Sequence, residues 1–171
     1  MTTALEPAWL RAARAKLGTR EAAGAANNPT IIGWAKKLGA KVLGTIYNAD
    51  SVPWCGLFVA TCVAEAGLPV VSIALRAASW SSWGVPLSPD KLAPGAVLVF
   101  KREGGGHVGF YLGEDAAAYH VLGGNQSDAV TITRIAKDRC VARRWPAGRP
   151  LGSGPVAMKA IAGLPLSRNE A

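Results

Sequence analysis

Residues 94–112 read PGAVLVFKREGGGHVGFYL and decide the fold class, because the texture of the sequence changes here. After the turn at Pro94 and Gly95, the apolar residues form short runs rich in Val, Phe and Tyr, which are typical of β-strands. Turns containing Gly, Asp or Lys separate five such runs, at residues 96–101, 107–112, 118–122, 130–135 and 141–145. The spacing predicts an antiparallel β-sheet of about five strands, arranged as a meander.

Helical spacing dominates the part of the chain before this boundary. Apolar residues recur at helical intervals over residues 8–17, which predicts a short amphipathic helix. The motif Asn27-Asn28-Pro29 predicts a second helix start, and helical spacing then continues to Gly39. The apolar stretch at residues 54–66 ends at Gly67 and predicts a further helix. Helices followed by strands predict an α+β fold, with the N-terminal helices packed on the sheet.

The length and charge of the chain limit its organisation and its partners. Its 171 residues predict one domain over residues 1–146, and residues 147–171 are rich in Gly and Pro and predict a loosely held tail. The net charge of +8 favours anionic surfaces, namely cell wall, nucleic acid or membrane. The basic residues are scattered and no apolar stretch reaches the roughly 18 to 20 residues of a membrane span. We therefore expect a monomer that neither binds nucleic acid nor inserts into a membrane.

The N-terminus and the cysteines indicate a protein made in the cytoplasm with reduced thiols. The first 18 residues, MTTALEPAWLRAARAKLG, lack the charged start and long apolar run of a secretory signal. Three cysteines form neither a CxxC pattern nor an obvious disulfide framework. The spacing of the five Cys and His residues matches no zinc pattern, so we expect neither a metal nor another cofactor.

Cys55 is the first candidate for chemistry, because it falls where the helix over residues 54–66 begins. A thiol at a helix N-terminus lies beside unpaired backbone N–H groups and the positive end of the helix dipole, and both favour the thiolate. A thiolate is the nucleophilic form of cysteine. The alternative is that Cys55 packs as a small apolar residue, which is the commoner fate of a lone cysteine.

His107 is the candidate base, and it opens the predicted strand His-Val-Gly-Phe-Tyr-Leu. Alternation places His107, Gly109 and Tyr111 on one face of this strand. If residues 113–117 make a hairpin turn and Tyr111 pairs with Tyr119, Asn125 comes within reach of the His107 ring. A slip of one residue would present Gln126 instead.

The remaining polar residues have structural interpretations beside functional ones. His120 has the opposite strand parity from Asn125 and is expected to be a structural histidine, while Cys62 and Cys140 are expected to be inert. Asp50 precedes the helix of Cys55 and would either cap its loop or orient a substrate. The pair Trp80 and Trp83 is expected in the core.

Several of these motifs together resemble the CHAP and NlpC/P60 superfamily of bacterial and phage cell-wall hydrolases. The resemblance extends from about Trp9 to Pro146. It rests on Asn27-Asn28-Pro29, DSVPWCGLFV (residues 50–59), AGLP (66–69), ASW (78–80) with WG (83–84), PGAV (94–97), GHVGF (106–110), LGGNQSD (122–128) and RWP (144–146).

This resemblance implies a papain-like fold and a cysteine peptidoglycan hydrolase without a cofactor. The enzyme would be an N-acetylmuramoyl-L-alanine amidase or an endopeptidase of the stem or cross-bridge peptides, acting through a thioester. Cys55 would be the nucleophile, His107 the base and later the acid, and Asn125 the third member. Residues expected to bind or orient the substrate are Asp50, Trp54, Gly106 and Gln126.

The absence of a signal suits an endolysin-like or virion-associated protein that reaches the periplasmic wall through a holin, a phage injection device or a secretion system. Two other functions stay open on the sequence. One is a papain-like cysteine protease or deamidase acting on proteins, because the same three side chains would serve it. The other is a non-catalytic module that binds the wall or builds a virion, in which the thiol only packs.

Overall fold

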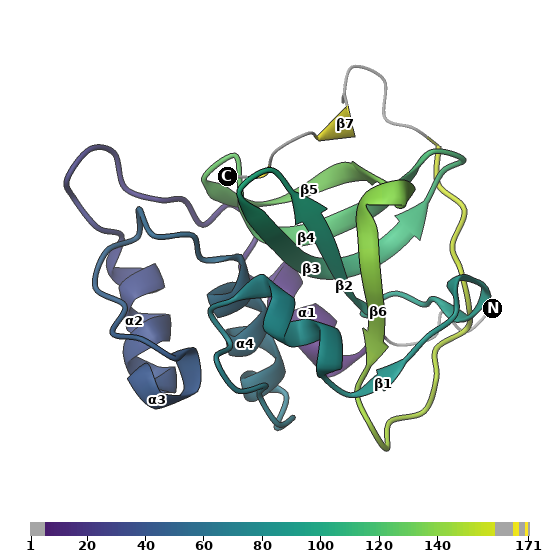
Figure 1. The fold of residues 1–171 in the computed structure, drawn as a ribbon, viewed down its shortest axis with the longest axis horizontal. Coiled ribbons are helices and arrows are strands. Elements are labelled where there is room, and N and C mark those ends of the chain that lie inside the picture. The colour runs from purple at the N-terminus through teal and green to yellow at the C-terminus, as the bar shows by residue number, and fades with distance from the viewer. Residues whose placement is uncertain (1–5, 160–165, 168–169, 171) are drawn as a thin grey trace.

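The computed structural model of the chain describes residues 6–159, 166–167 and 170, and it has helices in the first half and strands in the second. The helical elements are α1 (Ala8–Arg14), α2 (Pro29–Leu38), α3 (Ala40–Leu43), α4 (Cys55–Glu65) and the 3-10 turns η1 (Ala77–Ser82), η2 (Pro89–Lys91) and η3 (Lys137–Arg139). The strands are β1 (Val85–Pro86), β2 (Val97–Arg102), β3 (Gly105–Glu114), β4 (Ala118–Gln126), β5 (Ala129–Ala136), β6 (Cys140–Trp145) and β7 (Leu166–Ser167). Figure 1 shows α2, α3 and α4 gathered on one side of the molecule and the sheet on the other. The predicted α+β class is confirmed.

The sheet is mixed and has the order β1-β6-β2-β3-β4-β5-β7. The five predicted runs correspond to β2 to β6, and β2 to β5 pair antiparallel as neighbours. The simple meander is wrong beyond β5, because β6 returns to pair with β2 and β7 lies parallel to β5. The count of about five strands is also too low, since β1 and β7 have only two residues each and leave no periodic signal.

The sheet is strongly curved. The turn η3 is three residues long and joins β5 to β6, although three strands separate these two in the sheet order. Such a short link requires the two sides of the sheet to approach each other. Residues 107–113 of β3 are all buried, so both faces of this central strand are covered.

The helix boundaries follow the capping signals in the sequence. The side chain of Asn28 accepts a hydrogen bond of 2.8 Å from the backbone N–H of Thr30, and Pro29 occupies the first helical position of α2. Gly39 ends α2 with a φ of 90°. The first helix is shorter than predicted, because it ends at Arg14 and continues only as turns. The short helix α3 was not predicted.

Tryptophan side chains anchor the core. Trp9 is 5% exposed and donates its indole N–H to the carbonyl of Gly95 at 2.8 Å. Trp80 and Trp83 are buried and pack against each other, which confirms their expected place in the core. Helix α4 has nine buried residues and contacts both β3 and β4. Among the described residues, the helices are all too short or too polar to cross a bilayer.

The described parts of the C-terminal tail pack against the sheet. Backbone hydrogen bonds of 2.8 and 2.7 Å join Val156 and Met158 to Glu114. Strand β7 extends the sheet beside β5, and the buried side chain of Glu170 forms an ion pair with Arg139 at 2.7 Å. The prediction of a loosely held tail is therefore wrong for these residues, because they supply strand pairing and a buried charge pair.

Candidate active site

Cys55 is the first residue of α4, as the sequence predicted. The preceding residue, Trp54, has φ of −124° and ψ of 19°, so the chain turns into the helix directly before the cysteine. The first backbone N–H groups of a helix have no partner within the helix, and the helix dipole makes this end positive. The environment therefore favours the thiolate over the thiol.

Two close backbone contacts fix the first turns of α4. A Cβ atom on Gly56 would lie 2.3 Å from the carbonyl oxygen of Ala74 and 2.5 Å from that of Leu75. On the side facing β4, a Cβ atom on Gly124 would lie 2.6 Å from the Cβ of Phe58. Only glycine allows these approaches, so the start of α4 is wedged between a loop and the sheet.

His107 lies in β3, where it pairs with Phe100 of β2. Its ring stacks on the Phe100 ring with a centroid distance of 6.4 Å and an interplanar angle of 29°. The imidazole lies next to the Cys55 thiol, close enough for each side chain to shift the pKa of the other. His107 is 1% exposed and Cys55 is 3% exposed, so the structure brings these two predicted residues together in a desolvated environment.

The pair is polarised toward thiolate and imidazolium. Burial acts to raise the pKa of the Cys55 thiol, but the hydrogen bond and charge of His107, the backbone N–H of Val108 and the charge of Arg102 outweigh it, so this pKa is lowered. Burial acts to lower the pKa of His107, but the bond and charge of Cys55, the charge of Glu170 and the bond to Gln126 raise it overall. Each group thus stabilises the charged form of the other.

Gln126 is the side chain that holds the other side of the His107 ring. Its Oε1 atom lies 2.9 Å from Nε2 of His107. The Gln126 amide nitrogen donates to the carbonyls of Val121 at 3.2 Å and Thr131 at 2.8 Å, which fixes the orientation of the amide. Because Oε1 can only accept, Nε2 carries a hydrogen and Nδ1 is the ring nitrogen left for the thiol.

The prediction that Asn125 orients His107 is wrong, and a β-bulge explains why. Strand β4 shifts register between Gly123 and Gln126, and Asn125 adopts a left-handed φ of 57°. A Cβ atom on Gly123 would lie 2.5 Å from Oε1 of Gln126 and 3.3 Å from Nε2 of His107. The bulge therefore carries Gln126 onto the face of Gly123, whose missing side chain leaves the space that the amide fills.

The predicted pairing of Tyr111 with Tyr119 is also wrong. The structure pairs Tyr111 with Val121 and Tyr119 with Glu114. The hairpin loop is shorter than expected, because the carboxylate of Asp115 accepts two backbone N–H groups of the turn, at 3.0 and 3.1 Å. Because the turn closes later in the chain than predicted, each residue of β3 pairs with a later residue of β4 than expected.

Asp50 and Trp54 hold the loops in front of α4. Asp50 is 1% exposed, and its Oδ2 accepts backbone N–H groups of Ala22 at 2.8 Å and Asn28 at 2.7 Å. Trp54 is fully buried and donates its indole N–H to Glu21 at 3.1 Å. Asp50 was expected either to cap its loop or to orient a substrate, and these hydrogen bonds support the first role. Both side chains are thus engaged in holding the loops together.

The other candidate groups are structural. His120 is 2% exposed and its Nε2 lies 2.7 Å from Oδ2 of Asp115, which also binds Arg134. Cys62 is fully buried, and burial raises the pKa of its thiol. Burial also raises the pKa of Cys140. Within the described part of the chain, no three His, Cys, Asp or Glu side chains cluster in a way suited to a metal ion.

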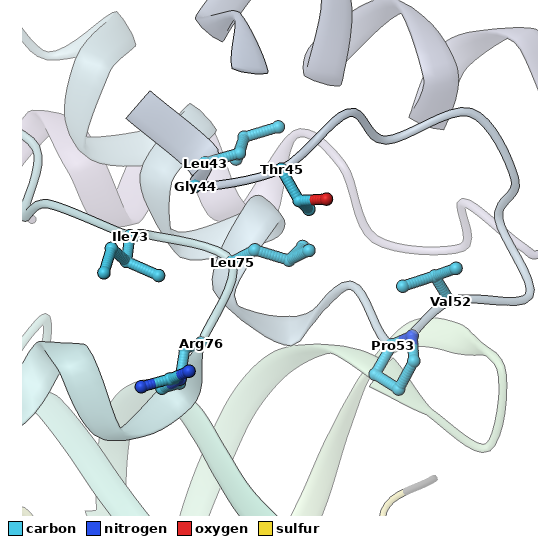
Figure 2. Close-up of a pocket in the computed structure, with 8 residues that line it drawn as sticks. All are labelled: Leu43, Gly44, Thr45, Val52, Pro53, Ile73, Leu75 and Arg76. Atoms are coloured by element: carbon cyan, nitrogen blue, oxygen red, sulfur yellow. The ribbon is translucent and has the colours of Figure 1, made fainter. Parts of the chain in front are cut away.

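Two cavities flank the segments that carry Cys55 and His107. The first has a volume of about 300 Å³ and is formed by residues 43–45, 52–53, 73 and 75–76, as Figure 2 shows. Its Val52 and Pro53 come directly before Trp54 and Cys55. The second has a volume of about 380 Å³ and includes Gly105 and Gly106, directly before His107. Gly106, predicted to contact substrate, thus lines a cavity beside the pair.

The sequence interpretation gave Gln126 only as the alternative to Asn125, and it missed the basic residues near the thiol. The run Gly-Gly-Asn-Gln-Ser-Asp at residues 123–128 carried a signal for the bulge, because Gly, Asn and Asp tolerate positive φ. Asn125, Ser127 and Asp128 all adopt such angles in the structure. The influence of Arg102 on Cys55 left no comparable pattern in the sequence.

The chain was compared with known proteins by sequence. No protein-family model matches it. No curated protein matches it either. The geometry of Cys55, His107 and Gln126 therefore carries the functional argument, with the motifs described above beside it.

Proposed function

We propose that the protein is a cysteine hydrolase that cleaves amide bonds in peptidoglycan. The observation that carries the proposal is the buried pairing of Cys55, at the start of α4, with His107, whose far side is held by Gln126. A thiolate at a helix start, a base bonded to it and a third group orienting the base are the parts of nucleophilic acyl-transfer catalysis. The same order of parts, helix-borne cysteine before strand-borne histidine, suits a papain-like fold.

The proposed reaction has two stages and needs no group beyond these side chains and water. The Cys55 thiolate attacks the amide carbonyl, and the backbone N–H groups at the start of α4 stabilise the oxyanion. The C–N bond breaks, the amine leaves with the proton from the His107 imidazolium, and a thioester remains on Cys55. Water then loses a proton to His107 and attacks the thioester, which releases the carboxylic acid and restores the thiolate and imidazolium pair.

Gln126 acts in this proposal as a positioning residue. Its Oε1 accepts from Nε2 of His107, which keeps the ring in the tautomer that presents Nδ1 to the thiol. This is the role that an Asn side chain performs in Cys-His-Asn proteases. The register shift in β4 puts Gln126 on the same strand face as Gly123. From that position the longer Gln side chain reaches the His107 ring.

Peptidoglycan is the proposed substrate on two grounds. The motifs around Cys55, His107 and the Gly-Gly-Asn-Gln run resemble those of wall hydrolases. The net charge of +8 would hold the protein on an anionic wall.

Digestion of purified peptidoglycan by wild type and Cys55→Ala tests the proposal. We expect fragments from the wild type alone, and mass spectrometry of those fragments identifies the bond. A free lactyl group on muramic acid means an amidase, whereas a new amino terminus within a stem means an endopeptidase. Intact wall in both samples, with a slow alkylation of Cys55 by iodoacetamide near neutral pH, would contradict the proposal and favour a non-catalytic wall-binding module.

A further inference from the structure

The loop at residues 74–77 lies between the two elements that carry the catalytic pair. At one end, the carbonyl oxygens of Ala74 and Leu75 occupy the space beside Gly56, directly after Cys55. At the other end, the Cβ of Ala77 lies 3.4 Å from the position that a Cβ on Gly106 would take, directly before His107. A substrate lying across the thiol and the imidazole would therefore pass this loop.

Arg76 is the charged residue of this loop, and it lines both cavities beside the pair. Its side chain is exposed. No hydrogen bond or ion pair joins this side chain to another residue of the described chain. Figure 2 shows it at the edge of the first cavity, across from Val52 and Pro53. The guanidinium group is thus available to a ligand in either cavity.

The charged residues that line the two cavities are all basic. The first is lined by Arg76 with no carboxylate, and the second by Arg76 and Lys101, again with no carboxylate. The other lining residues of the two are small, apolar or hydroxyl-bearing. Walls of low polarity around cations strengthen the attraction for an anion, because they exclude competing water.

We propose that Arg76 binds a carboxylate of the substrate, so that the protein prefers amide bonds in acidic peptides to those in neutral ones. The guanidinium group presents a planar fork of donors that matches a carboxylate in two parallel hydrogen bonds. Since Arg76 belongs to the loop between the segments of Cys55 and His107, the bound carboxylate would lie near the scissile amide. This inference rests on the proposed hydrolase function and names the substrate class of that same site.

The test uses two synthetic peptidoglycan stem peptides that differ only in charge. One keeps its free carboxylates, and in the other each carboxylate is converted to the neutral carboxamide. Wild type, Arg76→Gln and Arg76→Lys are assayed on both peptides. Arg149→Gln is the matched control, because Arg149 is also exposed and lines a separate cavity formed with Trp9 and Trp145.

We expect kcat/KM of the wild type to be about tenfold higher for the acidic peptide, from the strength of hydrogen bonds to charged groups. Arg76→Gln should remove this preference mainly through KM, and Arg76→Lys should retain part of it. Arg149→Gln should keep the full preference. Equal turnover of both peptides by the wild type, or an unchanged preference in Arg76→Gln, would overturn the inference while leaving the hydrolase function intact.

A binding measurement separates this inference from the function on which it rests. Calorimetry with Cys55→Ala protein should show tighter binding of the acidic peptide, and adding Arg76→Gln should make the two peptides equal. If the wild type cleaves neither peptide and releases no fragments from purified peptidoglycan, the hydrolase proposal fails, and this binding comparison still decides the role of Arg76. Equal affinity of Cys55→Ala protein for both peptides would refute that role.

Discussion

Replacing Gln126 by Ala tests the assignment of the third member of the site. The substitution removes the acceptor of the 2.9 Å bond from Nε2 of His107. Because His107 is charged when Cys55 is a thiolate, this bond is charge-assisted, and such bonds contribute about 1.5–3 kcal/mol. We expect kcat to fall by about 10- to 100-fold, since each 1.4 kcal/mol is a factor of ten.

The same substitution should change the titration of the active thiol. Gln126 helps to raise the pKa of His107, so its loss lowers that pKa and weakens the stabilisation of the thiolate. The rate of alkylation of Cys55 by iodoacetamide, measured from pH 5 to 10, should then rise at higher pH than in wild type. A residue with only a structural role would not move this profile.

Asn125→Ala is the matched control, and thermal unfolding separates stability from catalysis. Gln126→Ala also loses the bonds to the carbonyls of Val121 and Thr131, which contribute about 0.5–1.5 kcal/mol each. A fall in Tm of about 2–12 °C is expected for this variant, from the entropy of unfolding of a chain of this size. The reasoning is refuted if Asn125→Ala loses as much activity as Gln126→Ala, or if the alkylation profile of Gln126→Ala matches wild type.

Four further substitutions have defined outcomes. His107→Ala should abolish hydrolysis and slow alkylation of Cys55 at neutral pH, because the thiol loses the group that lowers its pKa most; an unchanged alkylation rate would contradict this. Gly56→Ala should destabilise the protein in urea by about 2–4 kcal/mol, since its Cβ meets two fixed carbonyls, whereas Gly33→Ala in α2 has open space and should gain about 0.5–1 kcal/mol. Asp115→Asn should flatten the loss of stability on acidification: the pKa of this carboxyl is held low, so its contribution is complete above its unfolded pKa of about 4 and disappears as pH falls toward its folded pKa. Acid titration of Asp115→Asn parallel to wild type would rule out that contribution.

The longer helices and strands of the fold could be predicted from the sequence because their signals are local. The cap at Asn28 and the apolar stretch after Trp54 each lie within a few residues of the boundary they set. The five main strands were likewise visible as short apolar runs. Their order was not, since the return of β6 to β2 depends on the curvature of the whole sheet.

The pairing of Cys55 with His107 could be predicted, whereas the residue that holds the other side of the His107 ring could not. Cys55 and His107 each carry a local reason for their role, namely a helix start and a strand opening after three glycines. The choice between Asn125 and Gln126 depends on a bulge and on where the β3–β4 turn closes. Both features are set by hydrogen bonds across the sheet, and a shift of one residue reverses the face that a side chain occupies.

The basic residues near the site could not be predicted from the sequence either. Arg76 and Arg102 lie far from Cys55 in the sequence, and nothing in their neighbours distinguishes them from the other scattered basic residues. Their relevance depends on a loop and a strand end that meet only in the folded chain.

The wedging of α4 between a loop and β4 also has a consequence for how the protein folds. The close contacts at Gly56 and Gly124 join the helical half of the chain to segments that are made later during synthesis. The nucleophile can therefore acquire its final position only after β4 has docked. Contacts between such distant segments form slowly, because a long loop must close first. Recovery of activity after dilution from denaturant should accordingly follow the slowest step of refolding, so that the reactivity of one thiol reports completion of the whole fold.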